Sequence, residues 1–189
     1  MSASESAPRP SDHHIRRLSR FLVWGVSLAA MLQLPVVWWM WLFPVTSDLV
    51  TSPVPGNGFG GGDLSWFILP VRLGAAGLAS IGALITIYGF YHLRSLFREA
   101  ARGAYFSGAA VTGFRQFALA SLVGALWDPA EHALMGVYLT VANPNVPNAL
   151  EISLGSGNLG AIGAALVFFL IAFILAEGRK RTEELELIL

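Results

Sequence analysis

Residues 159–176 read LGAIGAALVFFLIAFILA, a run without any charged or strongly polar side chain. At ~1.5 Å per residue, a helix over this run is ~27 Å long, close to the ~30 Å hydrocarbon core of a bilayer. Three other long apolar runs precede it, at residues 21–43, 67–91 and 111–141. The first of these contains a single strongly polar side chain, Gln33. The sequence therefore predicts four membrane spans.

The composition of the whole chain agrees with a lipid environment. Of its 189 residues, 54% are apolar and 13% are charged, and the mean hydropathy is +0.60. Soluble domains average ~25% charged residues, so this chain has too little charge to cover a water-soluble globule. The apolar runs also lack the alternation of a membrane β-strand, whereas a helix satisfies its own backbone in lipid. We expect an all-α, integral membrane four-helix bundle built from two antiparallel hairpins.

Basic residues lie at alternate ends of the predicted spans. The two connections at about 44–66 and 140–158 contain no Lys or Arg. Because basic residues are retained on the cytoplasmic side, we expect both termini and the middle connection in the cytoplasm, with the chain in a bacterial inner membrane. The basic residues occur before the first span, between or just inside the second and third, and after the fourth (Arg9, Arg16, Arg17, Arg20; Arg94, Arg98, Arg102, Arg115; Arg179, Lys180, Arg181).

The span pattern divides the chain into three parts. Residues 1–20 are expected to form a disordered basic arm, residues 21–178 the membrane domain, and residues 179–189 a cytoplasmic helical tail. The basic start followed by an apolar run resembles a signal peptide. The run is too long and too bulky at its far end, however, and no small-residue cleavage pattern follows promptly. We therefore expect the first helix to be retained.

Small residues recur at four-residue spacing in two of the predicted spans. Helices in lipid associate by close approach of their backbones, which small residues permit. We expect these faces to form helix contacts (Ala75, Ala79 and Ala83 in the second span; Gly157, Ala161 and Ala165 in the fourth).

The second and fourth spans are predicted to continue as charged helical segments. In residues 92–102, apolar side chains share one side at helical spacing, while Arg94, Arg98 and Arg102 recur every fourth residue. This pattern predicts an amphipathic helix in the inner loop. Two interpretations remain open, because such a helix either lies on anionic lipid headgroups or docks a protein.

Asp128, Glu131 and His132 form the only ionisable cluster inside a predicted span. Their spacing places them on one helix face, and ionisable groups inside a span suggest a function. Length arithmetic predicts that Glu131 lies near the outer edge, level with Arg72 of the second span. Three interpretations follow: an ion pair from Arg72 to Asp128 or Glu131, a polar pocket or ion site open to the outer face, or a sheltered cluster without a role.

Several kinds of chemistry are excluded or disfavoured. The chain has no cysteine, which excludes disulfides, cysteine-ligated zinc, iron–sulfur clusters and thiol catalysis. His92 and His132 are predicted at opposite ends of their spans, so they cannot ligate one haem iron. The net charge of zero argues against direct binding to nucleic acid. No hydrolase arrangement is evident, so we expect a protein that is not an enzyme and has no cofactor and no metal site.

Residues 98–107, REAARGAYFS, followed by AV at 110–111 and FRQF at 114–117, resemble the inner loop of a bacterial four-span family. That family is domain of unknown function 2975. LTVANP at 139–144, the serine-containing turn before Leu159 and the EGR sequence from Glu177 are also similar to it. The resemblance covers nearly all of the chain after the basic arm. The DPAEH segment that contains Asp128 is not part of the family pattern, and the family supplies no established catalytic residues.

The resemblance implies a small inner-membrane protein without an enzymatic motif, in a family whose genes often accompany a short helix-turn-helix regulator. We therefore expect a regulator or scaffold that engages a cytoplasmic DNA-binding protein. One alternative is that the inner loop only stabilises the bundle. Another is small-molecule or ion binding or transport through Asp128, Glu131 and His132. The candidate partner surface comprises Arg98, Arg102, Tyr105, Phe106 and Arg115, together with the helix predicted at 179–187.

Overall fold

The computed structural model describes residues 10–43, 68–104, 107–142 and 156–186. These residues form four helices and no strand: α1 (Pro10–Leu42), α2 (Leu69–Arg102), α3 (Gly108–Ala142) and α4 (Ser156–Glu186). Each helix contains a segment that is long and apolar enough to cross a membrane. The predicted all-α, four-span membrane bundle is therefore confirmed.

The ends of the helices differ from the predicted spans in an informative way. Helix α1 begins at Pro10, so residues 10–20 of the expected disordered arm are helical. Proline is well tolerated in the first turn of a helix, where its missing N–H would have no partner. Both α2 and α4 continue past their apolar runs, as predicted. The amphipathic segment 92–102 is a direct continuation of α2 and not a separate helix.

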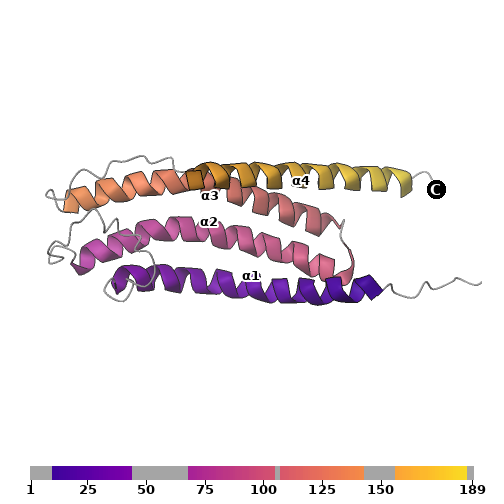
Figure 1. Ribbon diagram of the computed structural model, residues 1–189, viewed down its shortest axis with the longest axis horizontal. Coiled ribbons are helices and arrows are strands. Elements are labelled where there is room, and N and C mark those ends of the chain that lie inside the picture. Colours follow the sequence, from indigo (N-terminus) through magenta and orange to yellow (C-terminus); the bar gives the residue numbers. More distant parts are fainter. Residues whose placement is uncertain (1–9, 44–67, 105–106, 143–155, 187–189) are drawn as a thin grey trace, which may run out of the picture.

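The helices run alternately up and down in a row, and each packs mainly against its neighbours in the chain (Figure 1). Helices α2 and α3 therefore occupy the middle of the row, with α1 and α4 outside them. Helix α4 is shifted lengthwise relative to α3 (Figure 1). It begins level with the middle of α3 and projects past the turn between α2 and α3 (Figure 1).

Two separate cores hold the row together. The first lies towards the start of α2 and contains buried Trp41, Ala75, Ala76, Met135 and Leu139. It joins α1, α2 and α3, because each of these helices contributes a side chain. Ala75 and Ala83 are buried, so the predicted small-residue face of the second span is confirmed as a contact surface.

The second core lies towards the turn between α2 and α3. Phe114, Ala118 and Ala172 are buried there, with Leu93 and Phe168 packed against them. This core joins α4 to α3 and to the end of α2. It also shows what the apolar side of residues 92–102 does, because Leu93 and Leu96 contact protein side chains.

The small-residue face predicted for α4 is only partly correct. Ala165 is buried, but Gly157 and Ala161 are exposed. Gly157 and Ala161 lie on the same side of α4 as Ala165, but they line a cavity between α2, α3 and α4. The buried part of this side begins at Ala165 and continues through Phe168 and Ala172. Small residues permit a close contact, but they do not determine how far along the helix it extends.

Large apolar side chains cover the outside of the row. Trp24 and Met31 on α1 are each 76% exposed, and Phe173 on α4 is 69% exposed. A surface of this kind is unstable in water and is expected where lipid tails surround a protein. It agrees with the membrane assignment made from helix length.

Candidate functional site

A cavity of about 400 Å³ lies between α1, α2 and α3. Gln33 contributes to it from α1 and Thr86 from α2. The remaining polar groups come from α3, where the predicted cluster faces the same space. Three helices thus present polar side chains to one cavity, in a region that is otherwise apolar. Among the described residues, the lining comprises Gln33, Val37, Met40, Trp41, Ala79, Gly82, Ala83, Thr86, Gly124, Trp127, Asp128, Glu131, His132 and Met135.

The carboxylate of Glu131 is held in a fixed position within this cavity. Trp127, one turn earlier on α3, donates a hydrogen bond from its Nε1 to Glu131 Oε2 at 2.7 Å. Gly82 of α2 lies directly opposite, and a Cβ atom at this position would be 2.5 Å from Glu131 Oε2. The absence of a side chain at Gly82 therefore lets the Trp127–Glu131 pair lie against the backbone of α2.

Asp128 and His132 lie on the more open side of the same helix face. His132 Nδ1 lies 2.8 Å from the backbone carbonyl oxygen of Asp128 and 3.9 Å from the Asp128 carboxylate. Asp128 also lines a second cavity, of about 540 Å³, between α2, α3 and α4. Thr86 and Gly124 line both cavities, so the two adjoin at the contact between α2 and α3.

The predicted ion pair from Arg72 to Asp128 or Glu131 is not formed. Arg72 Nη1 donates instead to the carbonyl oxygen of Leu42, at the end of α1, at 3.3 Å. Glu131 lies opposite Gly82, which is ~15 Å further along α2 than Arg72 at ~1.5 Å per residue. The prediction that Glu131 and Arg72 lie at one level was therefore wrong. Glu131 of α3 lies opposite the middle of the apolar part of α2.

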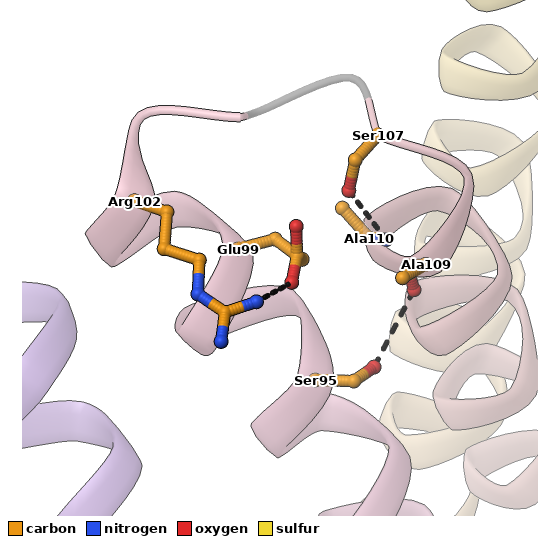
Figure 2. Close-up of polar contacts among 6 residues, drawn as sticks. All are labelled: Ser95, Glu99, Arg102, Ser107, Ala109 and Ala110. Carbon is orange, nitrogen blue, oxygen red and sulfur yellow. Dashed lines mark hydrogen bonds and ion pairs between the residues drawn. The ribbon is translucent and has the colours of Figure 1, made fainter.

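The second candidate region is the turn between α2 and α3, which Figure 2 shows in close-up. Helix α2 is capped at its end by Gly103, which has φ 83° and donates its N–H to the Ala100 carbonyl. Ala104 N–H bonds to the Glu99 carbonyl. This pair of bonds is the Schellman arrangement, in which the left-handed residue is commonly glycine. Helix α2 therefore ends at a defined position, and α3 begins at Gly108.

Side chains also fix this turn. Ser107 Oγ accepts the N–H of Ala110 at 3.2 Å and caps the start of α3. Ser95 Oγ lies 3.4 Å from the carbonyl oxygen of Ala109, across the two helices (Figure 2). Arg179 of α4 packs against Gly108 at the start of α3. Three helices thus meet at this end of the molecule.

The predicted partner surface is only partly described. Arg102 is exposed and forms a 2.9 Å ion pair with Glu99, as Figure 2 shows. Arg98 on α2 and Arg115 on α3 are exposed, and neither pairs with another described residue. Tyr105 and Phe106 lie outside the described residues. The structure thus brings Arg98, Arg102 and Arg115 to the same end of the molecule.

The sequence of the chain matches a known protein family. The family described as "Protein of unknown function (DUF2975)" matches residues 30–189. The chain belongs to the DUF2975 family. No curated protein and no solved structure matches this DUF2975 protein. The match includes all of the cavity-lining residues and the whole turn between α2 and α3.

Some residues of the cavity were not predicted as part of a site in this DUF2975 protein. The sequence could have indicated Gln33, since it is the only strongly polar side chain in residues 21–43. Nothing in the sequence indicated that Trp127 and Thr86 belong to a site, because tryptophan and threonine are ordinary in apolar helices. Only the packing of α1, α2 and α3 together shows that they share a cavity with Gln33 and Glu131.

Proposed function

We propose that this chain is a non-enzymatic protein of the bacterial inner membrane that engages a small cytoplasmic protein through its arginine-rich end. The observation that carries the proposal is the pair Arg98 and Arg115. Both are exposed without an ion pair among the described residues, and they flank a turn that is capped on both sides. Exposed cations without an ion pair among the described residues suit a partner with an acidic surface.

The orientation belongs to the same proposal. Arg98 and Arg102 lie in the last two turns of α2, Arg115 near the start of α3 and Arg179 near the end of α4. These helix ends lie at the same end of the bundle as the basic start of α1 (Figure 1). Because basic residues favour the cytoplasmic side, this end faces the cytoplasm. The family resemblance of the inner loop favours a small helix-turn-helix regulator as the partner. The protein would then hold a DNA-binding protein at the membrane without contacting DNA itself.

A site-specific photo-crosslinker tests the proposal in living cells. Placed at position 98 or 115, the crosslinker is expected to trap one small protein with an acidic surface. The matched control places it at position 20, on the part of α1 that precedes the family match. Replacing Arg98 and Arg115 together by glutamine is expected to abolish the product, whereas replacing Arg17 and Arg20 is expected to leave it unchanged.

Two outcomes would contradict this function. Crosslinking only to lipid at positions 98 and 115 would show that the arginines contact headgroups and not a protein. The same product at all three positions would show nonspecific capture at the membrane surface.

A second function is favoured by the cavity between α1, α2 and α3, and we propose it as the alternative. Gln33, Thr86 and Glu131 come from three different helices and meet in one space of about 400 Å³. Small-molecule sites have volumes of ~300–1,000 Å³ and combine apolar walls with a few convergent polar groups. The alternative function is therefore binding or transport of a small molecule or ion, tested by ligand titration of the wild type and Glu131→Gln.

A further inference from the structure

We propose that the cavity between α1, α2 and α3 binds a small organic cation, namely a protonated or quaternary amine with an apolar body. This inference rests on the second of the two proposed functions, and it names the chemical class of the ligand. Three features of the cavity support it: the charge of its lining, the arrangement of Glu131 and Trp127, and its apolar walls.

The first argument is the charge of the cavity lining. The lining contains two carboxylates, Asp128 and Glu131, one histidine, His132, and neither Lys nor Arg among the described residues. His132 lies beside Asp128, whereas Glu131 has no ion pair among the described residues.

Arg72 was the predicted ion-pair partner of these carboxylates. It lies ~15 Å along α2 from Gly82, the residue opposite Glu131, at ~1.5 Å per residue. Its side chain donates to the Leu42 carbonyl oxygen. A carboxylate in an apolar region is costly unless a positive charge accompanies it. The cavity therefore favours a cation and disfavours an anion.

The second argument is the arrangement of Glu131 and Trp127. The indole N–H binds Glu131 Oε2, so the indole ring and the carboxylate are held beside each other before any ligand arrives. Glu131 Oε1 accepts no hydrogen bond from another described residue. An indole ring beside a carboxylate is a favourable site for an ammonium group, because the face of the ring and the carboxylate both attract positive charge.

The third argument separates an organic cation from a metal ion. The described residues contain no group of three or more His, Asp or Glu side chains placed to hold a metal. Calcium and magnesium prefer six or more oxygen ligands, some of them from water. The remaining walls are apolar and adaptable, with Val37, Met40, Ala83 and Met135. Such walls suit hydrocarbon groups attached to a nitrogen.

The experiment compares a charged probe with an uncharged probe of similar size on the wild-type protein. Benzyltrimethylammonium is the cation and N,N-dimethylbenzamide the neutral compound. The full chain is purified in dodecyl maltoside, a detergent without an ammonium group, and each probe is titrated by calorimetry. We expect saturable binding of benzyltrimethylammonium and none of dimethylbenzamide.

Variants then assign the binding to this cavity. Glu131→Gln keeps the size of the side chain and removes its charge, so it is expected to weaken binding roughly tenfold or more. Trp127→Phe removes the indole N–H that positions the carboxylate and is expected to weaken binding as well. Glu177→Gln, which changes an exposed carboxylate of α4 outside the cavity, is the matched control and is expected to bind as the wild type does.

The outcomes distinguish the inference from the function on which it rests. Equal binding of both probes would overturn the cationic ligand and leave small-molecule binding supported. Binding of neither probe would count against both. If Glu131→Gln does not fold, the comparison of the two probes on the wild type still decides the question. Unchanged binding of the cation by a folded Glu131→Gln protein would also overturn the inference.

Discussion

At the scale of single residues, the contact between α2 and α3 depends on glycines that lie under side chains of the other helix. Gly82 lies under Glu131 and Trp127, and Gly74 lies under the Tyr138 ring. Tyr138 donates a hydrogen bond from its hydroxyl to the Val71 carbonyl oxygen at 3.2 Å. These contacts are polar, so the two glycines do more than let two backbones approach. They leave room for the Glu131 carboxylate and the Tyr138 phenol to lie against α2.

Gly82→Ala is expected to destabilise the protein by about 1–3 kcal/mol, the range for overpacking a tight contact. The new methyl group would be 2.5 Å from Glu131 Oε2 and 3.3 Å from the Trp127 ring. The side chains must move, which separates α2 from α3. Unfolding in mixed micelles of dodecyl maltoside and dodecyl sulfate, followed by circular dichroism, measures the change.

Gly77→Ala is the control for this prediction, because it lies on the same helix and a Cβ atom there meets nothing within 4 Å. Alanine is the better helix former by ~1 kcal/mol, so this variant is expected to be neutral or slightly more stable. Equal effects of the two substitutions would contradict the structural role of Gly82.

At the scale of elements, hydropathy was enough to predict all four helices but not how they pack. The apolar runs at 67–91 and 159–176 correspond to α2 and α4 because long apolar helices in lipid need no other signal. The level of Glu131 relative to Arg72 was predicted incorrectly. Apolar composition specifies that a helix crosses the membrane, but it leaves the axial shift between two helices open. That shift is set by particular contacts such as Tyr138 on Gly74.

Gly103→Ala is a prediction about the end of α2. Gly103 has φ 83°, and an L-residue in this left-handed conformation costs about 1–2 kcal/mol. We expect the turn between α2 and α3 to open more often, while the rest of both helices is unchanged. Hydrogen–deuterium exchange of the amides at 103 and 104, which bond to the last turn of α2, is expected to be at least roughly fivefold faster.

Gly163→Ala provides the comparison within α4, where a Cβ atom meets nothing within 4 Å. Exchange at the turn is expected to stay at the wild-type rate in this variant. Wild-type exchange in Gly103→Ala would show that the turn is stable without the glycine. The same variant tests the partner proposal, since a turn that opens displaces Arg98 relative to Arg115 and should reduce crosslinking.

At the scale of the whole molecule, the two cores divide the row into two parts with different neighbours. The core around Leu139 joins α1, α2 and α3, and the core around Phe114 joins α2, α3 and α4. The proposed ligand cavity lies beside the first core, and the arginine-rich turn lies beside the second. The two proposed functions therefore use different parts of one scaffold. Among the described helices, α2 and α3 contribute to both parts, so they are the elements through which we expect the two parts to be coupled.

The direction of the row across the membrane is the prediction on which the cytoplasmic partner depends. The chain contains no cysteine, so single cysteines can be introduced without removing any. Cysteines at Asn57 and Asn145, in the two connections without basic residues, are expected to react with an impermeant maleimide in intact spheroplasts. Cysteines at Ala104 and Lys180 are expected to react only after the membrane is opened.

Each labelling site serves as a control for the others, because an even number of spans places alternate connections on opposite sides of the membrane. Reaction at all four sites in intact spheroplasts would indicate leaky membranes and is checked with a cytosolic protein. Protection at Asn57 and Asn145 together with reaction at Ala104 would mean that the arginine-rich turn faces outwards. A cytoplasmic regulator could not then reach Arg98 or Arg115, and the cavity would be the function that remains.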